Sequence, residues 1–277
     1  MISPMLLPGI FRAWWKCRLY EPVTVTPVSI ARWLMQYKPR HRKSLLSLLN
    51  HVVFVDKGSV LAALVKGHRE IEGLLADDGV SPGHIIYVQV GDAASSSPVM
   101  LNMLRDAERF ERRGIPVLDS RDAQGISDLT TRLNRGAIVY VDDFSGSGVQ
   151  FLGARQFTSQ FIAGSFSEFF LSAVICEEAM ESVQAAQIQP VAGIEHKKTE
   201  RPLNDASSIF DAGVKGELLE LGRQLHAKHS LGFKNLGTNI VLYRNTPNST
   251  PLLLRGTLGQ RPFFGVLPAI ADLPVHR

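Results

Sequence analysis

Two adjacent carboxylates followed by a run of small residues are the strongest chemical signal in this chain. Asp142 and Asp143 come directly after the apolar run 137–141, and the stretch 145–148 reads Ser-Gly-Ser-Gly. Carboxylates can bind a divalent cation or accept hydrogen bonds from sugar hydroxyls, and small residues leave backbone N–H groups open to an anion. The pattern therefore predicts a site for a sugar phosphate.

A buried parallel strand would have to position these carboxylates. Five consecutive apolar residues, preceded by Gly136, are typical of a strand covered on both faces. In such sheets ligands bind beyond the carboxyl ends of the strands. A helix beginning at Ser147 or Gly148 would add free N–H groups and a dipole that favour phosphate. An ordinary strand end with a capped helix uses the same residue types, so the pattern remains a hypothesis.

These residues resemble the signature of type I phosphoribosyltransferases: four apolar residues, two acidic residues, two variable residues and a Thr/Ser/Gly loop. The resemblance implies that Asp142 and Asp143 are catalytic, contacting Mg²⁺ and the ribose hydroxyls of phosphoribosyl pyrophosphate. It also implies a loop around the 5-phosphate, formed by Ser145, Gly146, Ser147, Gly148 and Val149. The family usually has Gly and Thr where this chain has Val149 and Gln150, which removes one hydroxyl donor to the phosphate.

A second loop of small residues follows the predicted strand 84–90. It consists of Gly91, Asp92, Ala93, Ala94, Ser95, Ser96 and Ser97. Ser97 is suited to cap a helix that begins at Pro98. In type I phosphoribosyltransferases the corresponding loop binds pyrophosphate, so the resemblance implies that role here. An ordinary capped loop fits the same residues.

A further resemblance covers the C-terminal part of the chain. The segments Leu231–Gly237 and Tyr243–Pro251, the latter reading Asn-Thr-Pro-Asn at 245–248, are similar to a phosphoribosyltransferase-like branch found in bacterial conflict systems, including retron operons. This resemblance implies a toxic effector in antiphage defence. It also implies partners from the same operon, namely a reverse transcriptase, a small RNA–DNA and a DNA-binding protein.

The alternation of strand and helix patterns predicts an α/β fold: a parallel-sheet phosphoribosyltransferase-like core with a helical N-terminal part. Helical spacing between residues 26 and 67 predicts two or three helices. Further strands are predicted at 115–119, 169–176, 191–194 and 238–243, and further helices at 126–134, 151–161, 179–186 and 217–228. The turn-rich stretch 77–83 predicts a division into a helical part, 1–80, and a core domain, 81–277.

Composition indicates a globular chain and excludes several classes. The 277 residues are 45% hydrophobic, and the net charge of +4 is too small to indicate nucleic-acid binding by itself. Cys17 and Cys176 give neither a disulfide framework nor a metal cluster, which fits a reducing cytoplasm. The apolar patch 5–11 is too short to span a membrane. Trp14 and Trp15 could anchor it at an interface, but we expect packing on its own domain and no membrane partner; an oligomer is compatible with the sequence.

Two functions therefore stay open. The favoured one is a glycosyltransferase, a phosphoribosyltransferase-like enzyme that binds phosphoribosyl pyrophosphate or a related nucleotide with Mg²⁺. The alternative is an inactive module of the same fold that senses a nucleotide or binds a protein or nucleic-acid partner. A magnesium-dependent nuclease or nucleotide hydrolase has weaker support, because no further carboxylate stands at the spacing of a two-metal site.

Overall fold

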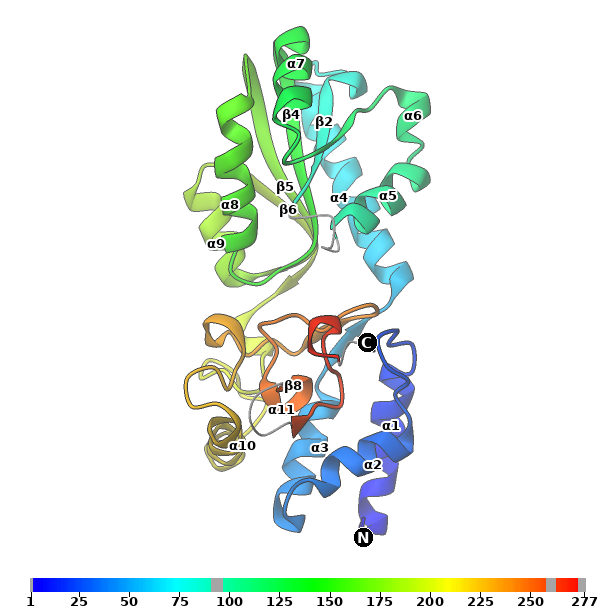
Figure 1. The fold of residues 1–277 in the computed structure, drawn as a ribbon, viewed down its shortest axis with the longest axis vertical. Coiled ribbons are helices and arrows are strands. Elements are labelled where there is room, and N and C mark those ends of the chain that lie inside the picture. The colour runs from blue at the N-terminus through cyan, green and yellow to red at the C-terminus, as the bar shows by residue number, and fades with distance from the viewer. Residues whose placement is uncertain (1, 91–96, 258–262, 274–277) are drawn as a thin grey trace. The chain divides into compact units, whose positions relative to one another are not determined.

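The computed structural model describes residues 2–90, 97–257 and 263–273. The chain forms two compact units, which are treated separately below (Figure 1). One unit spans residues 58–196, and the other combines residues 1–57 with 197–277. This division differs from the predicted boundary near residue 80. The helix before that point belongs with the sheet, and the last third of the chain packs with the N-terminal helices.

The sheet unit confirms the predicted α/β fold. Its strands are β2 (Ile85–Gln89), β3 (Val117–Asp119), β4 (Arg135–Ser145), β5 (Ser165–Cys176) and β6 (Gln189–His196). Its helices are α4 (Lys57–Asp77), α5 (Ser97–Ala107), α6 (Phe110–Arg113), α7 (Ala123–Leu133), α8 (Val149–Thr158) and α9 (Glu177–Ala185). All four strand pairings are parallel, in the order β3-β2-β4-β5-β6. The strand predicted at 115–119 is β3, which covers Val117–Asp119 and lies at one edge of the sheet.

Helices cover both faces of this sheet (Figure 1). On one face Ile138 and Tyr140 of β4 pack with Phe151 of α8 and with Val183 of α9. On the other face α4 lies very close to the sheet, because a Cβ at Gly193 would meet the Cβ of Ala63 at 2.2 Å. A side chain at that position would push α4 away from β6. The central strands are buried, as the continuous apolar runs predicted.

The second unit is mainly helical. Its helices are α1 (Leu7–Cys17), α2 (Pro27–Met35), α3 (Arg42–Asn50), α10 (Ala212–Leu225) and α11 (Leu252–Arg255). Its strands are β1 (Val53–Val55), β7 (Ile240–Leu242), β8 (Gly256–Thr257) and β9 (Phe263–Phe264). Thr26 caps α2 and Pro27 begins it. The parallel pairing of β1 with β7 joins the two distant segments of the unit. In the described part of the chain, every helix is too short or too polar to cross a bilayer.

Candidate functional site

The acidic pair lies inside the last third of β4, not after its end. The sequence predicted a strand over 137–141, but β4 continues to Ser145 because its pairing with β5 extends to Ser145–Ile175. The pairing of β4 with β2 ends earlier, at Gln89–Val141. Asp142 and Asp143 therefore lie in the part of β4 that continues after Val141, the last residue of β4 that pairs with β2.

The two carboxylates are buried beside each other. Asp142 is 4% exposed and Asp143 is 6% exposed, and one Asp142 oxygen accepts a hydrogen bond from the backbone N–H of Asp143 at 2.9 Å. Burial, followed by the negative charge of Asp143, raises the pKa of Asp142 well above its ordinary value. Such a pair favours holding a proton, or a cation, between its oxygens.

The turn after the acidic pair leads directly into α8. Ser145 is buried in the last position of β4, Gly146 and Ser147 are half-buried, and Gly148 precedes the first residue of α8. Gly148 has φ 75°, a left-handed conformation that residues with a Cβ adopt only with strain. Helix α8 thus begins one residue after Gly148, the later of the two predicted starts. The side chain of Val149 is exposed at the first helical position, so only its backbone N–H could contact an anion there.

Ser97 connects the ends of the two central strands. Its buried hydroxyl accepts a hydrogen bond from the N–H of Val90 at 2.8 Å and donates one to the carbonyl of Val141 at 2.6 Å. Helix α5 begins at Ser97, one residue before the predicted start at Pro98, and the Ser97 hydroxyl joins the strand ends instead of capping the helix. The other residues of the predicted pyrophosphate loop, 91–96, lie outside the described residues. The described part thus holds the ends of β2 and β4 together immediately before the acidic pair.

The strand order predicts that a ligand binds where β2 and β4 end. From β2 the chain proceeds to β3 on one side, whereas from β4 it proceeds to β5 and β6 on the other. In open α/β sheets ligands bind outside the carboxyl ends of the strands where the order reverses. The acidic pair lies in the last part of β4, residues 146–148 follow that strand, and Ser97 comes after β2, so these residues flank that point.

A family model of the phosphoribosyltransferase-like family PRTase-CE matches residues 30–264, which is most of the chain. The chain belongs to the PRTase-CE family. A search of curated proteins found no match.

Several solved structures are similar to this PRTase-CE chain over part of its length. Orotate phosphoribosyltransferase from Aeropyrum pernix is 18% identical, with 48% of this chain and 68% of that chain covered and a TM-score of 0.32. Orotate phosphoribosyltransferase from Mycobacterium tuberculosis H37Rv, in complex with phosphoribosyl pyrophosphate, is 14% identical, with 70% and 91% covered and a TM-score of 0.32. A hypothetical protein from Neisseria gonorrhoeae with bound ppGpp is 14% identical, with 62% and 98% covered and a TM-score of 0.37. The fold assignment rests on the family match and on the sheet topology described above.

The acidic pair of this PRTase-CE protein has the donor chemistry that Mg²⁺ prefers. Mg²⁺ is usually bound by one or two carboxylates, with water and substrate phosphates completing its shell. A cation between Asp142 and Asp143 would relieve the repulsion that raises the pKa of Asp142. No group of three or more His, Cys, Asp or Glu side chains suited to a metal occurs among residues 2–90, 97–257 and 263–273.

Glu177 and Glu178 occupy the first turn of α9. Acidic residues at the carboxyl end of a strand have two roles open to them: to approach a base or a metal, or to start the following helix. Acidic residues in a first turn stabilise the helix dipole. Their position agrees with the second role.

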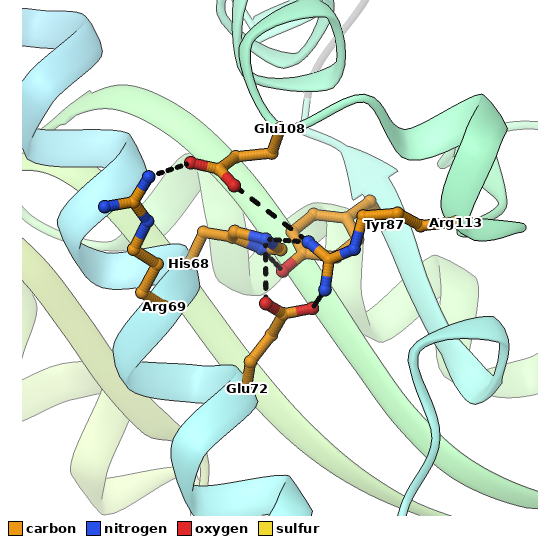
Figure 2. A network of polar contacts seen from close by, with 6 residues as sticks. All are labelled: His68, Arg69, Glu72, Tyr87, Glu108 and Arg113. Carbon is orange, nitrogen blue, oxygen red and sulfur yellow. Dashed lines mark hydrogen bonds and ion pairs between the residues drawn. The ribbon is translucent and has the colours of Figure 1, made fainter.

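A polar network that the sequence did not reveal supports β2, the strand whose end is held by the Ser97 hydroxyl through the N–H of Val90. Figure 2 shows its members: His68, Arg69, Glu72, Tyr87, Glu108 and Arg113. His68 of α4 is fully buried, and its Nδ1 lies 2.6 Å from the hydroxyl of Tyr87 on β2. Its Nε2 lies 3.1 Å from Nη1 of Arg113, which also pairs with Glu72. The network therefore ties α4, β2 and the end of α6 together.

The protonation state of His68 follows from its partners. Burial, as the largest cause, lowers the pKa of His68. Nε2 of His68 lies 3.1 Å from Nη1 of Arg113, which can only donate, and 3.2 Å from Oε2 of Glu72, which accepts, while Nδ1 faces the hydroxyl of Tyr87. His68 is thus a neutral imidazole held among a cation, a carboxylate and a phenol.

Acidification is expected to destabilise the sheet unit through His68. Because the folded pKa lies below that of the unfolded state, the unfolded chain binds the proton first as the pH falls below about 6.5. The free energy of unfolding should therefore decrease from about pH 7 to about pH 5. His68→Asn should reduce this slope, which urea unfolding at several pH values would measure. An unchanged slope in the variant would contradict the assignment.

Proposed function

We propose that this chain is a phosphoribosyltransferase-like enzyme that binds phosphoribosyl pyrophosphate, or a related nucleotide or sugar phosphate, together with Mg²⁺. The observation that carries the proposal is the placement of two buried carboxylates and a Ser-Gly-Ser-Gly turn at the reversal point of the sheet. Family membership agrees with it.

In this proposal the protein acts mainly by positioning. Asp142 and Asp143 hold the ribose hydroxyls and Mg²⁺, while the backbone N–H groups of 145–149 and the start of α8 bind the 5-phosphate. The bond between the anomeric carbon and pyrophosphate breaks, pyrophosphate leaves with its electron pair, and an acceptor nucleophile bonds to that carbon. Mg²⁺ supplies charge stabilisation to the leaving pyrophosphate. A base, a nucleotide, a nucleic acid or a protein side chain fits as acceptor.

The test is pyrophosphate release, followed by phosphorus NMR in a mixture of phosphoribosyl pyrophosphate, Mg²⁺ and purine and pyrimidine bases. Wild type should release pyrophosphate, and the double variant Asp142→Asn, Asp143→Asn should be slower by about 100- to 1000-fold. Asp128→Asn, an exposed carboxylate on α7, is the matched control and should behave as wild type. Equal turnover by the double variant would contradict the catalytic assignment.

A second candidate is a binding module that has lost turnover. Val149 and Gln150 stand where a phosphate-binding hydroxyl is expected, and the exposed Val149 side chain cannot replace it. This candidate predicts saturable, carboxylate-dependent ligand binding without pyrophosphate release. The same NMR mixture therefore separates the two functions once binding is measured.

A toxic role in antiphage defence is part of the proposal and rests on the resemblance of the C-terminal segments. Partners would then be a reverse transcriptase, a small RNA–DNA and a DNA-binding protein. If the enzyme is the toxic agent, expression of the wild-type chain without these partners should arrest bacterial growth. The double Asn variant should allow growth at equal protein level, and arrest by both would contradict a catalytic toxin.

A further inference from the structure

Helix α1 exposes a row of large apolar side chains. The exposed fractions are 46% for Leu7, 52% for Phe11, 61% for Trp15 and 56% for Leu19, which follows the helix end. Residues four apart lie above one another on a helix, so Leu7, Phe11 and Trp15 form one stripe. Met5, just before the helix, is 89% exposed. Contiguous exposed apolar surface of this kind marks an interaction site.

The opposite side of α1 is fixed to its own unit. Ile10, Ala13 and Cys17 are buried in the core of that unit. The ammonium group of Lys16 donates to the carbonyls of Asn50 at 2.5 Å and of Val52 at 3.0 Å, which attaches α1 to the end of α3. The apolar stripe is therefore presented by a packed helix and needs no unfolding to be reached.

The charged side chains of the first 20 residues all have one sign. Residues 1–20 contain Arg12, Lys16 and Arg18 and no acidic residue. Arg12 and Arg18 are exposed, and the guanidinium carbon of Arg18 lies 3.6 Å from the ring centroid of Trp15. Apolar and aromatic side chains are thus combined with cations on the exposed side of the segment.

We propose that this face of α1 docks on an anionic lipid surface. A helix with Trp, Phe and Leu on one face and basic residues beside them has the chemistry of an interfacial helix. With 11 residues α1 is about 16 Å long, well short of a hydrocarbon core of about 30 Å, so it would lie in the plane of the interface.

Other occupants fit this face less well. Pairing with a second copy of the same face would place Arg12 and Arg18 beside their own equivalents, without an acidic residue to compensate. A nucleic acid would match the arginines and the aromatic rings, but it offers little to the aliphatic Leu7 and Leu19. An anionic lipid surface accepts both the aliphatic and the cationic groups.

The proposal replaces the sequence expectation of no membrane partner. The sequence left the same two alternatives open for Trp14 and Trp15: both belong to an interfacial anchor, or both belong to a segment that packs on its own domain. In the structure Trp14 packs against the core, whereas Trp15 points outward with Phe11. Successive residues of a helix are rotated by about 100° around its axis, so Trp14 and Trp15 lie in different environments.

Vesicle co-sedimentation of the full chain tests the proposal. Wild type should bind phosphatidylcholine vesicles containing about 30% phosphatidylserine at least about tenfold more tightly than pure phosphatidylcholine vesicles. Raising the salt from about 0.1 M to about 0.5 M should weaken this binding. The double variant Phe11→Gln, Trp15→Gln should lose it by about tenfold or more, because its apolar contact is reduced.

The matched control changes two equally apolar exposed residues elsewhere, Leu74→Gln and Phe157→Gln. This control should bind as wild type, and equal circular dichroism spectra and melting temperatures would show that all variants fold. Failure of wild type to bind anionic vesicles, or equal binding by the Phe11, Trp15 variant, would overturn the proposal. The proposal would also be overturned if single-stranded DNA binding or dimer formation depended on Phe11 and Trp15 and vesicle binding did not.

Discussion

Asp142→Asn is expected to stabilise the fold at neutral and alkaline pH while abolishing its proposed chemistry. The folded pKa of Asp142 is raised by burial and by Asp143, so between about pH 4 and that pKa the folded chain holds a proton that the unfolded chain has lost. The wild-type chain therefore loses stability as the pH rises through this window. Asn keeps the acceptor for the Asp143 N–H and carries no charge. The variant should melt about 2–4 °C higher at pH 8.

Melting temperatures measured from pH 4 to pH 9 would test this expectation. The advantage of Asp142→Asn should be smallest near pH 4 and should grow as the pH rises, whereas Asp128→Asn on the surface should follow wild type. Mg²⁺ should stabilise wild type more than Asp142→Asn, because the cation favours the charged pair. A variant less stable than wild type at every pH would show that the carboxylate serves the fold rather than a ligand.

Phe151→Ala is expected to reduce the free energy of unfolding by about 3–5 kcal/mol. Phe151 lies in the first turn of α8 and is fully buried. Its ring stacks on Phe170 of β5 at 4.1 Å between centroids and meets the ring of Tyr140 edge-on at 5.3 Å. These contacts attach the start of α8 to the sheet, so their loss should also displace the N–H groups proposed to bind phosphate.

Urea unfolding would give the stability loss, and Phe157→Ala on the same helix is the control. Phe157 is 41% exposed, so its removal should cost less than about 1 kcal/mol. Phe151→Leu keeps most of the buried volume and should fold, which allows ligand affinity to be measured when α8 is only slightly displaced. If Phe151→Ala cost no more than Phe157→Ala, the stacked rings would not be what holds α8.

The sequence predicted the elements whose signals are local. The apolar run before Asp142 and helices that begin near Gly148 and near Ser97 all follow from neighbouring residue types, and in the structure each helix begins within one residue of its predicted start. The length of β4 does not follow in this way. It depends on pairing as far as Ser145–Ile175, and that partner strand is specified elsewhere in the chain.

Long-range contacts account for what the sequence did not predict. The strand β1 lies within a stretch predicted to be helical, and it forms because Val53–Val55 pairs with Ile240–Leu242. The same pairing returns the last third of the chain to the N-terminal helices. His68 gave no signal either, because its partners Tyr87 and Arg113 come from other elements and only the fold brings them together.

The most direct test of the central claim is isothermal titration of phosphoribosyl pyrophosphate with Mg²⁺ into three proteins. Wild type and Asp128→Asn should bind with the same affinity, and the Asp142→Asn, Asp143→Asn variant should bind at least about 100-fold more weakly, a difference of about 2.7 kcal/mol. Equal binding by the double variant would mean that the acidic pair does not hold the ligand. No binding by wild type would mean that this site does not take phosphoribosyl pyrophosphate.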